Sequence, residues 1–478
     1  MWIAIIIGAT LIIFISVLVI RTLAFKPAVS AVPDIVDVAV DADEVTQHLA
    51  AMVRCKTVSS KDESLTDIME FEKFRGLLKK LYPGVHKTCK PEHIGPSGLL
   101  FTFKGKSSEA PAVFMSHYDV VTAEDAAWDK PPFEGIVEDG VLWGRGTLDT
   151  KGTLCGVMEA AEALVKDGFV PENDIYLAFS GDEEIAGETA PAMVAELEKR
   201  GIVPVLVVDE GGAVVENIFP GVTRPCALIG TAEKGMLDLK LDIKSQGGHA
   251  SAPPPHTLIG ELSKAVVKIE NKPFKARLTP PIAAMFDTLG RHSSFVYRMI
   301  FANLWCFLPV LDRLCRKSGG ELNAMMRTTC AFTMMSGSNA TNILPPAAMM
   351  GANLRIIGGD TYEGAVEYLK SVAGNPGIEF NTVYGMNPSR ASLTSGPVWE
   401  RLKGAVAQTW PEAIVSPYLM VACSDSRHYC RISDGVYRFS AMTLSKEERG
   451  YIHGHNERIT VKSLTKIVQF YSRLMRNC

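Results

Sequence analysis

The 478-residue sequence has no surplus of basic residues, because 53 Asp and Glu outnumber 49 Lys and Arg and leave a net charge of −4. This balance gives no reason to expect a nucleic-acid partner, which usually selects for a basic patch. The ten cysteines form no CxxC pair. The nearest pairs, Cys306/Cys315 and Cys423/Cys430, are conceivable disulfides, but buried free thiols are favoured, and the redox compartment stays open.

The N-terminal segment lacks charge altogether over residues 2–20. It is long enough to cross about 30 Å of hydrocarbon, and Arg21 follows it at one interface. We therefore predict a membrane anchor over residues 1–26 and a stalk over residues 27–42. A cleaved signal peptide, giving a secreted protein, is the alternative, although its apolar core is usually only about 7 to 15 residues and follows its positive charges. The side of the membrane stays open.

The next part of the chain alternates strands and helices, which predicts an α/β layered domain with a largely parallel central sheet. Short apolar runs predict four buried strands at Leu99–Phe103, Ala112–Met115, Ile175–Phe179 and Pro204–Val208. A helical face covers Thr153–Val165. This catalytic domain is expected over residues 43–228, and it resumes over residues 388–478 with an amphipathic helix at its end.

A second domain is expected over residues 229–387, inserted into the first. Its predicted order of elements, βα, then ββ, then αβ, suits a small ferredoxin-like α+β lid covered by two helices. These elements are expected at Met236–Ile243, Thr257–Ile269, Thr328–Met335, Ala348–Ile356, Tyr362–Val372 and Ile378–Val383. An apolar insertion at about 281–320 interrupts the lid. Pro309 and Asp312 break its apolar run, so we do not predict a second membrane span there.

Potential metal ligands begin at the end of the second predicted strand. His117 and Asp119 lie two residues apart, so both side chains are expected on one face. A carboxylate that accepts the second ring N–H of a histidine fixes its tautomer and strengthens it as a ligand. Asp149 follows in the Gly-rich turn GRGTLDTKG, where small residues allow the backbone to approach an ion.

Acidic residues also follow the other predicted strands. Glu183 and Glu184 stand in SGDEEIAG, and Asp209 and Glu210 stand in VVDEGG. One acidic turn is usually only solvated, but ligands bind at the carboxyl ends of parallel strands, and successive clusters there indicate a site. The C-terminal motif YIHGHNERI adds His453 as a nitrogen ligand.

Taken in order, SHYDVV, GRGTLDTKG, SGDEEIAG, VVDEGG, GGHAS and IHGHNERI resemble the motifs of the co-catalytic dizinc exopeptidase family. That family includes carboxypeptidase S, secreted N-acyl amino acid hydrolases, aminoacylase-1 and succinyl-diaminopimelate desuccinylase. The resemblance covers residues 43–478 and is greatest for the carboxypeptidase S branch, in which SHYDVVP, DEGG and TDSRHY recur. Thr122 and Ser424 depart from that pattern, and neither is a ligand position.

The resemblance implies two Zn²⁺ ions per subunit, with Asp149 bridging them. The implied ligands are His117, Asp149, Glu184, Asp209 and His453. Asp209 is preferred to Glu210 because it ends the strand. Asp119 is expected to orient His117, Glu183 to act as the general base, and His455 to lie outside the ligand set.

The lid is also expected to contribute to catalysis. The resemblance implies that His249 of GGHAS donates to the developing oxyanion, and in many relatives this histidine comes from a partner subunit. A homodimer through the lid is therefore possible, although the insertion could alter subunit pairing. Arg355 in ANLRI resembles the residue that grips a substrate carboxylate, and Asn342 acts near it.

The predicted function is a zinc exopeptidase of the carboxypeptidase type, which hydrolyses the amide bond next to a free amino-acid carboxylate. The alternative is an N-acyl amino acid amidohydrolase or synthase of the aminoacylase type. A third, remote alternative is an inactive binding or scaffold relative, which would be expected to have lost a ligand or the base. The expected substrates are small peptides or N-acyl amino acids.

Overall fold

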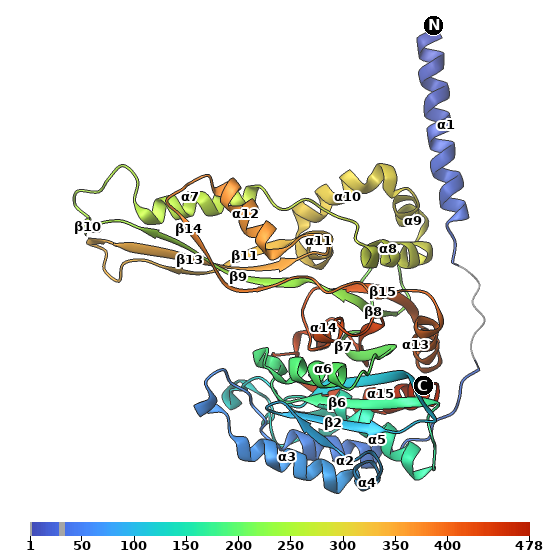
Figure 1. Cartoon of the computed structure of the whole chain (residues 1–478). Helices are drawn as coiled ribbons and strands as arrows, with labels where there is room; N and C mark the ends of the chain where they lie inside the picture. The colour runs from blue at the N-terminus through green and yellow to red at the C-terminus, as the bar shows by residue number, and fades with distance from the viewer. Residues whose placement is uncertain (1, 28–33) are drawn as a thin grey trace.

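The computed structural model describes residues 2–27 and 34–478 (Figure 1). Helix α1 (Trp2–Ala24) projects from the body of the molecule, and 6% of its most apolar window is buried. Its length and its mean hydropathy of 3.1 suit a membrane span, and a signal sequence has the same properties. Residues 28–33 of the expected stalk lie outside the described part of the chain.

The central sheet has eight strands in the order β1-β2-β6-β3-β7-β16-β8-β15. Their bounds are β1 Glu92–Ile94, β2 Gly98–Phe103, β6 Asn173–Ser180, β3 Ser107–His117, β7 Leu206–Val215, β16 Val436–Leu444, β8 Cys226–Glu233 and β15 Ile414–Met420. The four predicted strands are confirmed as β2, β3, β6 and β7. The expectation of a largely parallel sheet is wrong, because the sheet is mixed. Strands β6, β3, β7 and β16 pair with one another in parallel, and so do β8 and β15. Antiparallel pairing joins β1 to β2, β2 to β6, and β8 to both β7 and β16.

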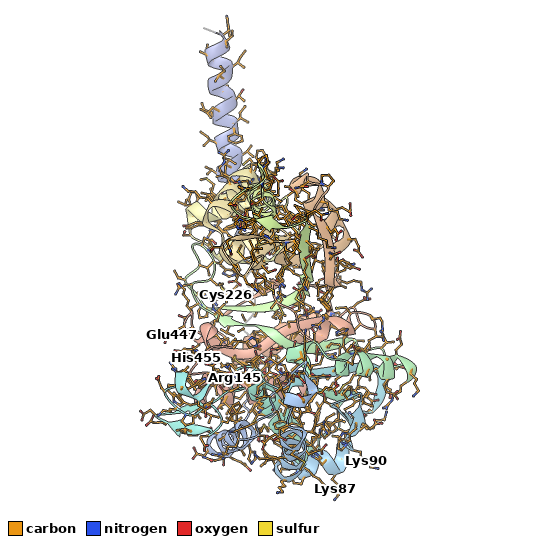
Figure 2. The ribbon with its side chains drawn as sticks, turned by 90° about the vertical axis from the view of Figure 1, so that its left-hand side faces the viewer. Lys87, Lys90, Arg145, Cys226, Glu447 and His455 are labelled. Atoms are coloured by element: carbon orange, nitrogen blue, oxygen red, sulfur yellow. The ribbon has the colours of Figure 1, made fainter. Side chains whose placement is uncertain are left out.

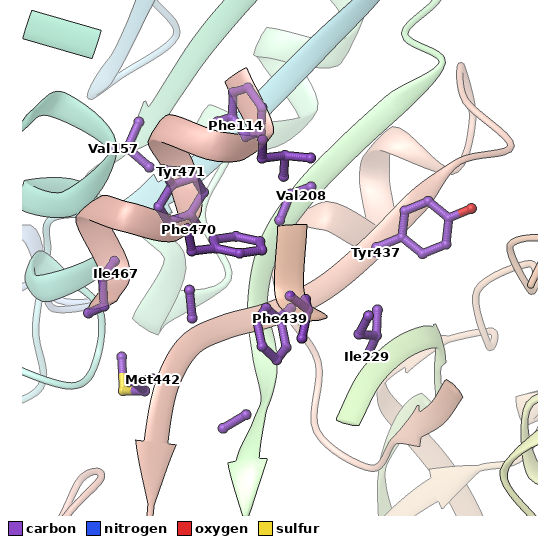
Figure 3. Packing of buried hydrophobic residues seen from close by; sticks show 14 of the residues in the cluster. Phe114, Val157, Val208, Ile229, Tyr437, Phe439, Met442, Ile467, Phe470 and Tyr471 are labelled. Carbon is purple, nitrogen blue, oxygen red and sulfur yellow. The ribbon is translucent and has the colours of Figure 1, made fainter. Parts of the chain in front are cut away.

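Helices cover both faces of this sheet. The larger core contains residues of α2 (Ala42–Val53), α3 (Ile68–Leu81), α4 (Pro83–Cys89), α5 (Lys151–Lys166), α13 (Pro397–Thr409) and α15 (Val461–Arg476). Successive strand residues point to opposite faces, so Phe114 packs 5.8 Å from Tyr471 of α15, while Val113 joins α6 (Thr189–Lys199) and α14 (Ser426–Tyr429) on the other face. Phe439 and Phe470 continue the larger core at 5.4 Å (Figure 3). Burying one such ring stabilises the fold by about 1.5–3 kcal/mol.

The lid is a four-stranded antiparallel sheet in the order β11-β13-β9-β14. Its elements match the predicted ones: β9 Gly235–Lys244, α7 Leu258–Asn271, β11 Thr329–Ser336, β13 Ala347–Ile356, α12 Tyr362–Ala373 and β14 Glu379–Met386. Both helices pack on one face and form a separate core with the sheet. A two-stranded pair, β10 (Gly248–His249) with β12 (Ile343–Leu344), forms the far tip (Figure 1). Strand β8 runs almost directly into β9 at Lys234, so the expected boundary at 228/229 falls inside β8.

The insertion is helical and joins the lid to the catalytic domain. Its helices are α8 Pro280–His292, α9 Phe295–Ala302, α10 Leu304–Ser318 and α11 Gly320–Met326. Helix α8 buries Phe286 and Leu289 in the larger core, next to β15. Helices α9 and α10 meet at a bend of 110°, and Pro309 lies within α10. All ten cysteines are free, as expected.

Candidate metal centre and active site

Three parallel strands carry most of the candidate site. Strands β6, β3 and β7 are neighbours and run the same way, so their carboxyl ends meet at one edge. His117 is the last residue of β3, and Glu183 and Glu184 form a short 3₁₀ turn after β6. Glu210 lies on β7 beside a break in its pairing with β16, where Asp209 opposes Arg438 but Gly212 already opposes Phe439. The break leaves Glu210 and Gly211 as a bulge that re-aims the side chain at this position.

The fourth contribution comes from the Gly-rich turn that precedes α5. The backbone N–H groups of Gly146, Leu148 and Asp149 donate to one oxygen of Glu457 at 3.1, 2.7 and 3.2 Å. Arg145 pairs with the other oxygen at 2.7 Å, and both side chains are buried. Strand β17 (Arg458–Thr460) begins after Glu457 and pairs with β5 (Val141–Trp143), next to β4 (Ile136–Glu138). Glu457 thereby binds the Asp149 turn to the C-terminal segment that carries His453.

Asp149 lies at the centre of the cluster, between two histidines. Its Oδ1 is 3.0 Å from Nε2 of His117, and its Oδ2 is 2.9 Å from Nε2 of His453. Glu184 Oε2 is 3.1 Å from the same nitrogen of His453, and Glu210 Oε1 is 3.5 Å from Nε2 of His117. A carboxylate with one oxygen toward each imidazole has the arrangement expected of a ligand that bridges two ions.

Two sets of ligand atoms converge within 4.8 Å of one another. One set is His117, Asp149 and Glu184, and the other is His117, Glu183 and Glu210. The expected Asp209 belongs to neither set. Its Oδ2 accepts the backbone N–H of Ser426 at 3.0 Å, and the side chain is buried away from the cluster. The bulge instead turns the next residue, Glu210, toward His117.

Asp119 holds His117 and the Glu183 turn together. Nδ1 of His117 lies 2.9 Å from the backbone carbonyl of Asp119 and 3.3 Å from its Oδ1, which leaves Nε2 free to face the cluster. The Asp119 carboxylate also accepts the backbone N–H groups of Glu183 at 3.2 Å and Glu184 at 3.1 Å. Ser59 donates its hydroxyl to the same carboxylate at 2.7 Å. Asp119 lies where the orienting role requires it.

The cluster concentrates negative charge in a buried place. Burial, followed by the charge of Asp149, raises the pKa of Glu210 well above its ordinary value, and burial does the same for Glu183. Burial disfavours the charged form of His117, but Glu210 and hydrogen bonds to Asp119 and Asp149 outweigh it and raise that pKa. Hydrogen bonds to Asp149 and Glu184 raise the pKa of His453 to about 10. Such a field favours cations between the carboxylates.

The donor chemistry fits a pair of zinc ions. Zinc prefers imidazole nitrogen and carboxylate oxygen, and the cluster offers two histidines and four carboxylates with a central one shared. No thiol contributes to either converging set among the described residues. A donor set of this kind suits zinc better than calcium, which takes oxygen ligands.

The lid residues are distributed differently. His249 is exposed on β10 at the lid tip, where its Nδ1 lies 2.8 Å from Ser251 Oγ, and the carbonyl of Asn342 accepts the N–H of Ala250 at 3.0 Å beside it. Within one chain this tip extends away from the catalytic sheet (Figure 1). Arg355 instead lies at the other end of β13, where a guanidinium nitrogen is 3.5 Å from Cys423 Sγ. A single chain therefore does not bring His249 and Asn342 to the cluster.

Sequence reasoning missed the residues that hold the ligands. Glu457 and Arg145 carry the Asp149 turn, and Ser59 supports Asp119. Glu457 stands four residues after His453 in the motif YIHGHNERI, and its place in that motif could have indicated a role at the site. Arg145 also donates to the carbonyl of Gly454 at 2.9 Å. The next residue, His455 (Figure 2), is exposed and belongs to neither converging set of the described residues.

The fold and the cluster define a two-metal hydrolase with a separate lid domain. Residues 113–477 match the model of peptidase family M20/M25/M40, and the chain belongs to this family. It is 34% identical over 442 residues to probable carboxypeptidase S-like 2 from Dictyostelium discoideum, covering 91% of this chain and 85% of that protein. It is 32% identical over 482 residues to N-fatty-acyl-amino acid synthase/hydrolase PM20D1 from Xenopus tropicalis, covering 98% and 93%.

The fold is also similar to a solved member of the family. The M20 family metallo-carboxypeptidase Sso-CP2 from Sulfolobus solfataricus superposes with a TM-score of 0.66 at 16% identity, covering 91% of this chain and 99% of that one. The protein is thus a zinc-dependent hydrolase, either an exopeptidase or an N-acyl amino acid hydrolase, with two zinc ions as its cofactors.

Proposed function

We propose that the protein hydrolyses the amide bond next to a free amino-acid carboxylate, in short peptides or in N-acyl amino acids. The observation that carries this proposal is the Asp149 carboxylate between His117 and His453, with Glu183 beside it. We assign Glu210, in place of Asp209, to the ligand set. The proposed ligands are His117, Asp149, Glu184, Glu210 and His453.

When bound, the two zinc ions polarise the scissile carbonyl and make a water molecule acidic enough to attack at neutral pH. Glu183 accepts a proton of that water on its carboxylate while the water oxygen bonds to the carbonyl carbon, and it then gives the proton to the leaving nitrogen, so that the C–N bond breaks. Asp119 positions both His117 and the backbone of Glu183. A proton taken up and released by one carboxylate leaves the enzyme unchanged after each turnover.

Recognition of the substrate carboxylate is assigned to Arg355. It lies at the base of the lid, near Lys234 and Arg327. Burial is the main cause that lowers the pKa of Lys234 to about 7, and the neighbouring charges of Arg355 and Arg327 add to it, so these two arginines contribute a positive potential at this end of the lid. A carboxylate is the substrate group that such a potential attracts, and a guanidinium grips it with two parallel hydrogen bonds.

The contribution of His249 and Asn342 requires a second subunit. We propose a homodimer through the lid, in which the lid tip of one chain reaches the cluster of the other. The open face of the lid sheet supports this proposal, because Met334 and Tyr384, which pair with Gly351 and Asp238 on that face, are 59% and 37% exposed. Sedimentation of the purified protein tests it, and a monomer that hydrolyses at the full rate would refute it.

We also propose that α1 anchors the protein in a membrane. The first charged residue after Trp2 is Arg21, so an uninterrupted apolar stretch is available to the bilayer. Resistance of the full-length protein to extraction by high salt and alkaline pH tests the anchor. A mature N-terminus near residue 32 would indicate a cleaved signal peptide instead.

One assay separates the two substrate classes. The purified, zinc-loaded protein is offered dipeptides and long-chain N-acyl amino acids in parallel, and kcat/KM is compared. The carboxypeptidase assignment predicts a preference for dipeptides. Similarity over 93% of an N-fatty-acyl-amino acid synthase/hydrolase favours the acyl substrates as the second candidate. Failure to hydrolyse either class with both metals bound would refute the proposed function.

A further inference from the structure

The C-terminal end of α1 is seated on the insertion, although most of the helix is exposed. Arg21 donates through Nε and a terminal nitrogen to the carbonyl of Ala302 at 3.2 and 3.1 Å. Asn303 donates to the carbonyl of Leu18 at 3.2 Å, and Thr22 is completely buried in this contact. Since side-chain and backbone hydrogen bonds fix both partners, the insertion has a defined position relative to α1.

One contact between the insertion and α1 lies further toward the N-terminus of α1. The ring of Trp305, the second residue of α10, packs edge-on against Phe14 with centroids 5.9 Å apart. Phe14 lies seven residues before Arg21, or about 10 Å along the helix axis. Whatever surrounds α1 at the level of Phe14 therefore also surrounds Trp305, which is 59% exposed.

Helix α10 divides its side chains between the protein core and the outside. Leu304, Leu308, Leu311 and Cys315 follow helical spacing and pack against the larger core. Away from that face, Val310 and Leu314 are 53% and 57% exposed. In the first turn of α9, Phe295, Val296 and Tyr297 are exposed as well. Large apolar side chains are thus exposed on both arms of the bent pair α9–α10.

Basic side chains lie among these apolar ones. Arg313, Arg316 and Lys317 are exposed at the C-terminal half of α10 and form no ion pair within residues 2–27 and 34–478. The one acidic residue of α9–α10, Asp312, is already paired with Arg327. This surface therefore combines apolar side chains with unbalanced positive charge.

We infer that α9 and α10 form a second membrane contact, which lies in the headgroup region of an anionic phospholipid bilayer. This inference rests on the proposed membrane anchor. Both helices lie on the side of the body from which α1 projects, as two views at right angles show (Figures 1 and 2). Interfacial helices bury apolar side chains about 5–10 Å into the bilayer, which matches the depth of Trp305 beside Phe14. Lys and Arg beside them reach the phosphates of anionic lipids.

The test uses the full-length protein reconstituted in vesicles of phosphatidylcholine and phosphatidylserine. Val310→Cys is labelled with a polarity-sensitive fluorophore, and Val170→Cys, on the catalytic domain between α5 and β6, is the matched control, because the two valines are 53% and 51% exposed. Wild-type protein carried through the same labelling gives the background from native cysteines. We expect a blue-shifted emission at position 310 and loss of most of its intensity with lipids that carry a quencher, and neither effect at position 170.

An emission that shows position 310 to be as water-exposed as position 170 would overturn the inference. A blue shift without lipid quenching would also overturn it, since a second copy of the chain would then cover the surface. Arg313→Glu with Arg316→Glu and Lys317→Glu should reduce the quenching at position 310, and unchanged quenching would contradict the role of charge.

Flotation of the vesicles and N-terminal sequencing separate this inference from the anchor. Protein that retains α1 and floats, yet shows no quenching, refutes only the α9–α10 surface. Protein that has lost α1 and does not float refutes both, whereas protein that has lost α1 and still floats with quenching at position 310 supports the surface alone. Hydrolysis of a soluble substrate by the same preparation reports on the active site independently.

Discussion

The metal cluster and the tip of the lid carry comparable sequence motifs, but they are organised very differently. In the cluster, each central ligand is held by a further buried group, as Asp119 holds His117 and Glu457 holds the Asp149 turn. At the tip, His249 is exposed on a strand of two residues and contacts only its own loop and β12 among the described residues. One chain thus pre-organises the centre of its metal site, whereas its own His249 lies outside that site.

The largest effect is expected where the organised region is broken at its centre. Asp149→Ala removes the carboxylate that faces both histidines, so both ions should bind weakly and turnover should fall below detection. Metal analysis after dialysis, compared with wild type, measures this loss. His453→Ala is the matched partial variant, because it removes a ligand from one side only. Two tightly bound zinc ions in Asp149→Ala would contradict the bridging assignment.

Glu183→Gln tests chemistry without disturbing the ions. The amide keeps the size of the side chain but cannot accept a proton, so kcat should fall by about 10²–10⁴-fold while zinc content is unchanged. Glu188→Gln, an exposed carboxylate on the same segment, is the control and should be neutral. A Glu183→Gln enzyme with intact metal and near-normal kcat would show that another group is the base.

The next largest effect is expected at the tip of the lid, which carries His249. His249→Ala should lower kcat by about 10²–10³-fold through loss of an oxyanion donor. If the histidine crosses between subunits, mixing and reassembling His249→Ala with Glu183→Gln should restore activity to about a quarter of wild type, because each mixed dimer regains one intact site. Two separately inactive proteins that stay inactive after reassembly, with mixed dimers demonstrated, would place His249 outside the partner's site.

The sequence predicts features that depend on neighbouring residues, and it does not predict features that depend on distant parts of the chain. Apolar runs located the strands of both sheets, because burial on a strand leaves a local pattern. Strand direction leaves none, so the antiparallel pairings of β2 and β8 in the central sheet were missed. The place of His117 at the end of β3 was predicted from its position in the sequence alone.

Asp209 and Glu210 show what a local pattern cannot decide. Alternation along β7 would have decided which acid faces the cluster, but the bulge at Glu210 and Gly211 breaks the alternation. The signal for that bulge lies in the pairing with β16, more than 200 residues later, and is therefore tertiary. The position of His249 is likewise set by the lid as a whole.

The smallest of the four effects is expected at Arg355, which lies between the two regions. Its strand neighbours in β9 and β11 fix the backbone, and its guanidinium contacts Cys423 on the catalytic domain. If Arg355 grips the substrate carboxylate, Arg355→Lys should lower kcat/KM by about 10- to 100-fold, because charged hydrogen bonds contribute about 1.5–3 kcal/mol and an ammonium cannot reproduce the fork. A surface ion-pairing role would instead change stability by less than about 1 kcal/mol and leave kinetics intact.

The deciding measurement is kcat/KM for a substrate acid and its matching amide, in wild type and in Arg355→Ala. Wild type should prefer the acid, and the variant should lose that preference. Equal discrimination by both proteins would assign the carboxylate to another residue and leave Arg355 as a structural link between lid and catalytic domain.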